Sequence, residues 1–196
     1  MARTAQKRHS IVAPAPTPPL MGARSVLGGR PGRFFALFAV WFLSGFSMLT
    51  TPTVRPLAIR FSGALVTASG ALIHLCGGNA WVDGTVLRDP STGMAIEMKD
   101  GCNGAYVTIL LCSALLAFPA SWLQRAKGLF IGCAAIQSIN LARFISLFYL
   151  RQYNQAWFDF AHEYLWESLI MLDALAVFWM WVQTVFRSTA MSDAQA

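Results

Sequence analysis

The sequence predicts an all-α polytopic membrane protein with a small extracytoplasmic β-hairpin. Hydrophobic residues make up 56% of the 196 residues and charged residues only 12%, a balance that soluble domains rarely show. The apolar residues form long runs instead of alternating faces, as membrane helices do. Basic residues gather near the N-terminus, where they usually report membrane topology, so the net charge of +6 does not indicate a nucleic-acid partner.

The two ends of the chain differ in composition from its middle. Residues 1–32 are basic and rich in proline, so they cannot bury a hydrophobic core and are expected to form a disordered basic tail. Residues 33–187 are expected to form one membrane-embedded domain, and residues 188–196 a polar C-terminal tail. Because no small-residue cleavage site stands out after the first apolar stretch, we expect an uncleaved first helix instead of a signal peptide.

Five helical segments are expected, at about 33–50, 57–75, 103–118, 129–150 and 164–186. Pro52 and Pro56 separate the first segment from the second, and Pro119 ends the third, because proline breaks the helical ladder. The second segment is less apolar than the first, and Gly63 and Gly70 recur on it at seven-residue spacing beside a row of polar residues. Such a face fits either close packing against another helix or an amphipathic helix in the interface, and both interpretations stay open.

The stretch between the second and third segments holds most of the polar character of the domain. Residues 81–87 and 94–98 are short strand-like runs, and residues 88–93 between them are rich in turn formers. This pattern predicts a β-hairpin that ends directly before Cys102.

Charged loops predict the orientation of the chain in the membrane. Arg125 and Lys127 place the connection between the third and fourth segments in the cytoplasm, so the acidic hairpin lies outside. If the segment 57–75 crossed the membrane, the basic N-terminal tail would lie outside, against the same rule. We therefore favour a segment 57–75 that lies against the outer leaflet, and the side of the N-terminal tail stays open at this point.

Three side chains are expected to meet at the outer membrane boundary. Cys102 lies at the start of an apolar segment, and a helix start favours the reactive thiolate. Arg143 lies inside the fourth segment. Inserting a charged side chain into the membrane there costs ~2.5–3.5 kcal/mol of free energy, so the residue is taken as a candidate functional residue. His162 stands at the outer entry of the last segment. A histidine can hold a thiol as thiolate and an arginine can neutralise an oxyanion, so the set predicts nucleophilic catalysis.

Each of these residues also has a structural interpretation. Cys102 could be a small packing residue or could form a disulfide with Cys76. Arg143 could snorkel to the interface or pair with Asp173. Asn140 lies three residues before Arg143 on the same helical face, where it could orient the guanidinium or bond to another helix.

In these residues the chain resembles the exosortase/archaeosortase family, and most closely its short form, exosortase H. Three motifs in order carry the resemblance: Cys102-Asn103-Gly104, Asn140-Leu-Ala-Arg143, and His162 before the last helix. The similar phrases lie at 136–150 and 156–162, and the resemblance as a whole covers about residues 81–182.

The resemblance implies a multi-pass enzyme of the bacterial inner (plasma) membrane, with its active site on the extracytoplasmic side. It implies a cysteine protease or transpeptidase that cleaves C-terminal sorting signals of the PEP-CTERM kind, with Ile-Pro-Thr-Leu…Trp-Gly as the motif associated with exosortase H. The implied partners are the lipid bilayer, an exported substrate protein that carries such a signal, and an acceptor molecule of unknown identity. No metal and no cofactor are expected.

The resemblance also assigns roles by position. It implies that Cys102 is the nucleophile that forms a thioester, His162 the acid and base, and Arg143 the stabiliser of the tetrahedral intermediate. The residues expected to support them are Asn103, Gly104 and Asn140. Aromatic side chains near the same boundary are expected to keep the thioester dry or to form an ordinary interfacial belt, and they are Tyr106, Trp157, Phe158, Phe160 and Trp166.

Two other classes of function compete with this interpretation. A membrane thiol–disulfide protein would use Cys76 and Cys102, although the chain has no CxxC pair. A non-enzymatic membrane partner or small transporter would use Arg143 to bind an anion. His74 is a rival to His162 as the histidine of the site. A zinc protease is poorly supported because no HExxH motif is present.

Overall fold

The computed structural model describes residues 31–193, so most of the expected disordered tail at 1–32 lies outside the described residues. The helices are α2 (Pro31–Leu49), α3 (Arg55–Leu75), α4 (Ala105–Ala117), α5 (Trp122–Tyr153), α6 (Gln155–Phe160), the π-helix η1 (Ala161–Leu165) and α7 (Trp166–Asp193). The strands are β1 (Trp81–Asp83), β2 (Val86–Arg88) and β3 (Ala95–Glu97).

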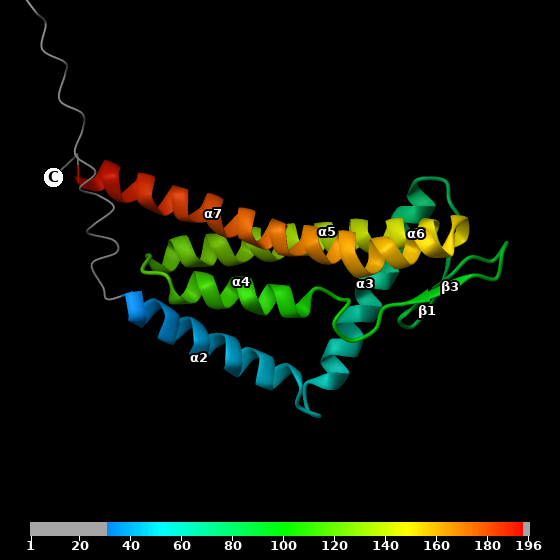
Figure 1. Cartoon of the computed structure of the whole chain (residues 1–196), viewed down its shortest axis with the longest axis horizontal. Helices are drawn as coiled ribbons and strands as arrows, with labels where there is room; N and C mark the ends of the chain where they lie inside the picture. The colour runs from blue at the N-terminus through cyan, green and yellow to red at the C-terminus, as the bar shows by residue number, and fades with distance from the viewer. Residues whose placement is uncertain (1–30, 194–196) are drawn as a thin grey trace, which may run out of the picture.

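The helices confirm the predicted all-α membrane class. Within the described residues, four helical stretches are long and apolar enough to cross a membrane: α2, α3, α5, and the continuous run of α6, η1 and α7. The helix α4 is also apolar but has only 13 residues, about 20 Å of helix. Figure 1 shows α2, α4, α5 and α7 running alongside one another, whereas α3 crosses the end of this bundle at a steep inclination.

The bundle core lies between α4, α5 and α7. Leu115 and Ile136 are fully buried there, together with Val185 near the end of α7. The indole Nε1 of Trp181 donates a hydrogen bond to the carbonyl of Gln124 at 2.9 Å. This contact depends on Gly128, because a Cβ at that position would clash with the indole of Trp181. The outermost helix, α2, packs on α4 and contributes Phe34 to the core.

Several helix ends differ from the predicted ones. The fourth helix begins at Trp122 instead of near 129, because Ser121 and Gln124 form a capping box at its start. The predicted connection after residue 150 is mostly helical. Asn154 interrupts the helix, and its side chain accepts hydrogen bonds from the N–H groups of Ala156 and Trp157, which restarts the chain as α6. The last helix continues to Asp193.

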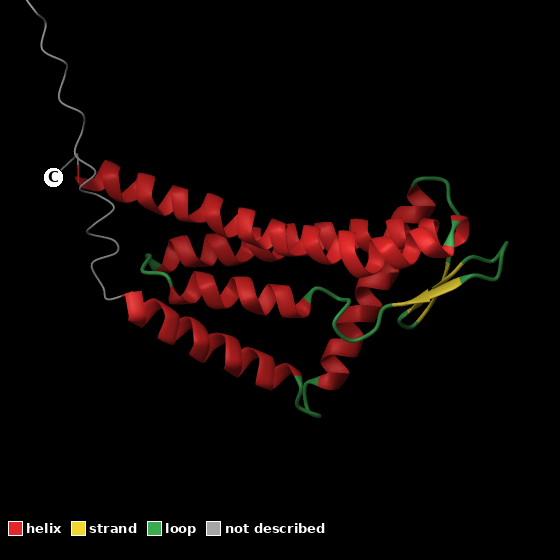
Figure 2. Ribbon diagram, in the orientation of Figure 1, coloured by secondary structure: helices red, strands yellow, loops and turns green. Residues whose placement is uncertain are grey.

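The predicted hairpin is a three-stranded antiparallel sheet in the order β1-β2-β3 (Figure 2). The run 81–87 is itself a hairpin, because Asp83 pairs with Val86 across a two-residue turn in which Gly84 has φ +61°. Glycine at the first of the two turn positions is a known hairpin signal. The sheet packs on α3 at Gly70, where a Cβ would lie 2.7 Å from Cγ2 of Val82. The small residues of α3 therefore serve sheet packing.

The turn between β2 and β3 is closed by one carboxylate. Asp89 accepts hydrogen bonds from the N–H of Ser91 at 2.9 Å, the hydroxyl of Ser91 at 2.7 Å and the hydroxyl of Thr92 at 2.7 Å. The hydroxyl bonds, first that of Ser91 and then that of Thr92, lower the pKa of Asp89 below its ordinary value.

We expect this turn to loosen in acid. A lowered pKa in the folded state means that the stabilisation is complete above the ordinary pKa of aspartate and is lost as the pH falls through the lowered value. Hydrogen exchange of the Ser91 and Gly93 amides, corrected for intrinsic rates, should therefore speed up only at strongly acidic pH. In Asp89→Asn the exchange should already be fast at neutral pH, and equal protection in both proteins at neutral pH would contradict this role.

The two ends of the bundle differ in what they carry. The start of α2, the connection between α4 and α5, and the end of α7 lie at one end, whereas α3, the sheet and α6 lie at the other (Figure 1). The first end carries Arg125 and Lys127, and the second carries the turn that holds Cys102.

Candidate active site

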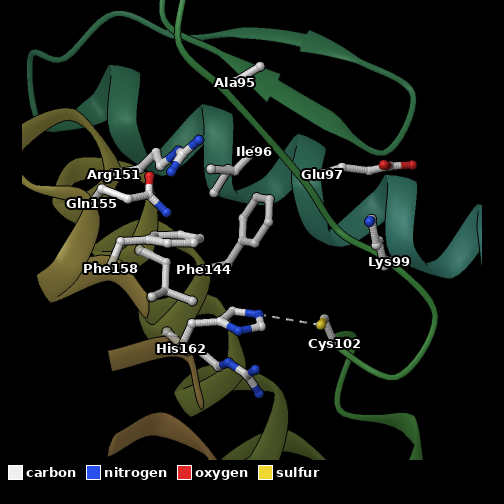
Figure 3. A pocket seen from close by; sticks show the side chains of 12 residues that line it. Ala95, Ile96, Glu97, Lys99, Cys102, Phe144, Arg151, Gln155, Phe158 and His162 are labelled. Carbon is white, nitrogen blue, oxygen red and sulfur yellow. Dashed lines mark hydrogen bonds between the residues drawn. The ribbon is translucent and has the colours of Figure 1, made fainter. Parts of the chain in front are cut away.

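A cavity of about 280 Å³ lies between the sheet and the helices at the sheet end of the bundle, and Cys102, Arg143 and His162 all line it. The remaining lining residues are Ala95, Ile96, Glu97, Lys99, Phe144, Leu147, Arg151, Gln155 and Phe158. Figure 3 shows β3 and the chain down to Cys102 along one wall, with Arg151, Phe158 and His162 on the opposite wall. The three residues predicted to act together thus share one cavity.

Cys102 lies on a tight turn between the sheet and α4. Its N–H donates to the carbonyl of Lys99 at 3.0 Å, and Gly101 next to it has φ +91°, a left-handed backbone that glycine adopts without strain. The first residue of α4 is Ala105, so Cys102 lies just before the helix and not in it. Its side chain is partly exposed to the cavity, where a substrate can reach the sulfur.

Asn103 anchors this turn to two helices. The side chain is 2% exposed, and its Nδ2 donates to the hydroxyl of Ser62 on α3 at 3.1 Å. Its Oδ1 accepts a hydrogen bond from the N–H of Ala105 at 3.0 Å, which satisfies a free donor of the first turn of α4. These two hydrogen bonds fix the backbone beside Cys102.

Gly104 caps α4 with φ +73° in close contact with α5. A Cβ there would lie 3.2 Å from Nε2 of Gln137 and 3.4 Å from Cγ of Asn140, so both backbone conformation and space favour glycine. Gly77 has a similar φ of +82° but open space around it.

We expect Gly104→Ala to lower both stability and activity. The left-handed backbone costs an L-residue about 1–2 kcal/mol, and the crowding against α5 shifts the Cys102 turn. Gly77→Ala is the matched control, because it places an L-residue in the same left-handed backbone conformation without a steric contact at Cβ. Thermal unfolding in detergent should show both variants destabilised, and only Gly104→Ala should lose substrate processing. Equal activity in the two variants would show that the contact of Gly104 with α5 does not affect activity.

His162 faces Cys102 across the cavity. Its Nε2 lies 3.9 Å from Sγ of Cys102, within the range of a hydrogen bond to sulfur (Figure 3). The imidazole stacks on the ring of Phe158, with centroids 5.6 Å apart and planes inclined by 19°. The guanidinium of Arg151 lies over the same phenyl ring, 5.3 Å from its centroid. Phe158 therefore contacts both His162 and Arg151 and holds the imidazole in place.

The backbone around His162 is a single π-helical turn, η1. Such turns are rare and are often found at functional sites, because one extra residue in the turn changes the direction of the side chains that follow. Here the turn joins α6 to α7, and His162 lies within it, four residues after Phe158, which also lines the cavity.

Arg143 is held by α5 in a nearly dry position. The residue is 6% exposed, and its Nη1 lies 4.0 Å from Oε2 of Glu167 on α7. Within the described residues Arg143 pairs with Glu167 and not with Asp173, which was a candidate partner from the sequence. The side chain of Glu167 is 63% exposed, so the buried cation is only loosely compensated.

Within residues 31–193, Asn140 makes neither of the hydrogen bonds expected for it, either to Arg143 or to another helix. It is fully buried and lies against Gly104, and neither its Oδ1 nor its Nδ2 has a hydrogen-bond partner within the described residues. It makes no hydrogen bond to Arg143 and does not line the cavity. Its contact with Gly104 links α5 to the start of α4.

Sequence reasoning did not assign Arg151 and Glu167 to the site. Arg151 could have been found from its spacing, because Arg143, Leu147 and Arg151 recur every four residues and therefore share one face of α5. Glu167 has no comparable signal, since its pairing with Arg143 depends on how α5 and α7 pack. Of the five aromatic side chains expected around the site, only Phe158 lines the cavity.

The rival residues lie elsewhere. All four cysteines are free, so Cys76 and Cys102 form no disulfide. His74 bonds through Nε2 to the carbonyl of Ala80 at 2.8 Å and does not line the cavity. In the part of the chain from 31 to 193, no group of three or more His, Cys, Asp or Glu side chains is placed to hold a metal ion.

The family model described as transmembrane exosortase (Exosortase_EpsH) matches residues 3–180, which is most of the chain. No curated protein and no solved structure matches the chain.

Proposed function

The chain belongs to the transmembrane exosortase family, whose members are multi-pass membrane proteins involved in protein sorting, and we propose that it is a cysteine-type peptidase or transpeptidase that acts on C-terminal sorting signals. One observation carries the proposal. The sulfur of Cys102 lies 3.9 Å from Nε2 of His162 in a cavity that Arg143 also lines. Nucleophile, proton carrier and cation are the parts that acyl transfer through a thioester needs.

The proposed reaction begins at the sulfur of Cys102. His162 accepts the thiol proton, and the thiolate attacks the carbonyl carbon of the scissile peptide bond, which forms a C–S bond and an oxyanion. The guanidinium of Arg143 stabilises that negative charge in a site of low exposure. When the C–N bond breaks, the imidazolium gives its proton to the leaving amine, and the amino-side fragment remains on Cys102 as a thioester.

The second half of the reaction releases the fragment. An acceptor with an N–H or O–H group enters the cavity, His162 takes its proton, and the acceptor attacks the thioester carbon. The C–S bond then breaks and Cys102 leaves as the thiolate. Transfer to water gives hydrolysis, and transfer to another nucleophile gives transpeptidation. The apolar side chains of Phe144, Leu147 and Phe158 in the cavity wall favour the second outcome, because they limit the entry of water.

The proposed substrate is an exported protein that ends in a short motif, an apolar helix and basic residues, with Ile-Pro-Thr-Leu…Trp-Gly as the motif to test first. Its apolar helix would lie in the bilayer beside the bundle, and the bond to be cut would then lie at the membrane surface. This is the depth that the proposal requires for Cys102, which precedes the membrane helix α4.

We propose that the sheet end of the bundle lies on the extracytoplasmic side of the inner membrane. With α3 in the outer interface, the proposed crossings are α2, α4, α5 and α7, and both Arg125 and Lys127 fall inside. The 13 residues of α4 reach only about 20 Å, so the turns on either side of α4 complete its crossing in this arrangement. The position of α3 across the bundle supports this arrangement (Figure 1). So does its exposed surface, which combines Arg60 with apolar side chains such as Leu57 and Ile59.

The thioester is the sharpest test of the proposed function. Purified full-length protein in nanodiscs is incubated with a fluorescent substrate that contains the motif and the apolar helix, and is quenched in acid. We expect a covalent adduct of the amino-side fragment on wild-type protein that neutral hydroxylamine releases. The adduct should be absent from Cys102→Ala. An adduct that resists hydroxylamine, or one that also forms on Cys102→Ala, would exclude a thioester on this residue.

A further inference from the structure

The strand β3 is one of the two edge strands of the sheet, and it borders the cavity that Cys102 lines. The order β1-β2-β3 leaves β3 paired on one side only. Three successive residues of β3, Ala95, Ile96 and Glu97, line the cavity. Side chains alternate between the two faces of a strand, so a cavity on one face would contact every second residue. Contact with three in a row indicates that the cavity runs along the edge of β3.

The pairing of β2 with β3 shows which backbone groups are already used. The N–H of Asp89 donates to the carbonyl of Met94 at 2.8 Å, and the N–H of Met98 donates to the carbonyl of Thr85 at 2.9 Å. Antiparallel ladders alternate between hydrogen-bonded and non-hydrogen-bonded pairs. The residues of β3 that bond to β2 are therefore Met94, Ile96 and Met98.

Ala95 and Glu97 consequently direct their N–H and C=O groups away from β2, toward the free edge. Within residues 31–193, no hydrogen bond outside the ladder uses the backbone of either residue. Both residues are exposed. A free strand edge with unpaired backbone groups binds extended peptides by adding a strand to the sheet.

We propose that the substrate binds as a short fourth strand on β3, paired with the backbone of Ala95 and Glu97. This rests on the proposed function, because the occupant is the extended segment that precedes the scissile bond. The cavity between β3 and the wall formed by Phe158 and His162 has room for a short peptide segment and no more, at about 280 Å³. Its far end is the sulfur of Cys102, so the peptide would reach the nucleophile directly from the strand (Figure 3).

The direction of β3 assigns the direction of the substrate. β3 runs from the outermost loop of the sheet back toward Cys102 and the start of α4 (Figure 1). A substrate whose last helix is in the membrane also runs from the aqueous side toward the membrane. The added strand is therefore parallel to β3, and its backbone bonds fix the peptide without demanding particular side chains.

Disulfide crosslinking measures both the pairing and its direction. The protein carries Cys102→Ala and Cys76→Ala, to remove the nucleophile and the exposed thiol, and either Ala95→Cys or Glu97→Cys. A membrane-anchored substrate carries one cysteine, moved residue by residue through the segment before its apolar helix. We expect a sharp optimum for each protein, with the optimum for Glu97→Cys two residues closer to the substrate helix. A shift in the opposite sense overturns the parallel arrangement, and crosslinking without a positional optimum overturns strand addition.

A pair of variants tests the backbone bonds without crosslinking. Glu97→Pro removes the N–H at the free edge, and proline is tolerated at such an edge position because that N–H does not bond to β2. Glu97→Ala removes the same side chain and keeps the N–H. Processing by Glu97→Pro should fall about five- to ten-fold below that by Glu97→Ala, as expected for loss of one hydrogen bond. Equal rates for the two variants contradict strand addition.

The failure of this inference can be told apart from the failure of the proposed function. The substrate without an added cysteine is co-expressed in cells either with wild-type protein or with Cys102→Ala. If the substrate is processed to the same extent with wild-type protein and with Cys102→Ala, the proposed catalysis is wrong. The strand inference is then wrong as well, because it rests on that catalysis. If only the wild type processes it, the catalysis stands, and the crosslinking register alone decides whether the substrate adds to β3.

Discussion

Replacing Cys102 by alanine is expected to abolish processing of a sorting-signal substrate, with a fall of about 10⁴-fold or more in rate. The reason is chemical: alanine has no atom that can form the thioester, and neither His162 nor Arg143 can replace the sulfur as the nucleophile. Full-length substrate should accumulate in cells that produce the variant. Immunoblotting of the substrate in membrane fractions, with the variant itself quantified, measures the loss.

Cys76→Ala is the matched control for this loss. Cys76 is exposed at the end of α3 and is not among the residues of the cavity, so its removal tests for general effects of losing a thiol. We expect the control to process substrate at the wild-type rate. If both variants lose activity, a thiol–disulfide mechanism gains support. If Cys102→Ala keeps its activity, the transpeptidase mechanism is wrong, and either anion binding by Arg143 or a purely structural role of these residues becomes the leading interpretation.

The sequence predicted the bundle well because hydrophobic runs and proline breaks are local signals. It also assigned Cys102, Arg143 and His162 to one depth, and the structure brings them into one cavity. These predictions depended on counting residues along helices from the membrane boundary. Such counting gives depth but not the angle around the bundle. The 3.9 Å approach of sulfur to imidazole depends on how α4, which follows Cys102, packs against α7, which follows the π-helical turn of His162.

The parts that the sequence did not predict depend on contacts between distant segments. A π-helical turn has no residue signature, so the direction of His162 could not be derived from its position in the chain. The anchoring of Asn103 by Ser62 joins segments 41 residues apart. The ion pair of Arg143 with Glu167 was missed because Asp173 and Glu167 are both acidic residues on the last helix, and only the packing shows which one is near.

The segment 57–75 is another case in which contacts with distant segments decide the environment of each side chain. Its recurring glycines and its row of polar residues predicted a polar or small face, suited either to close packing or to an interfacial helix. The structure shows that Gly70 packs on the sheet and that Ser62 is buried beneath Asn103, while Arg60 and Thr67 are exposed. The sequence could not separate these environments, because they depend on where the sheet and the Cys102 turn lie against α3.

Replacing Arg143 by glutamine is expected to lower the rate of thioester formation by about 10²–10³-fold, as for removal of a donor from an oxyanion site. Arg143→Lys should lie between glutamine and the wild type, because lysine keeps the charge but lacks the planar fork of donors. Single-turnover formation of the adduct in nanodiscs measures the rate. Substrate binding, read from the crosslinking yield in the Cys102→Ala background, should change little, because the oxyanion exists only after the thiolate attacks.

Glu167→Gln separates this role from a structural one. If Arg143 served mainly to pair with Glu167 and fasten α5 to α7, removing either partner would lower thermal stability and activity together. The pair is 4.0 Å apart, and its attraction is weakened by solvent because the carboxylate of Glu167 is largely exposed, although Arg143 itself is buried. We therefore expect Glu167→Gln to lose at most a few-fold in rate. A loss as large as that of Arg143→Gln, with a matching fall in melting temperature, would show that Arg143 acts by holding the helices together.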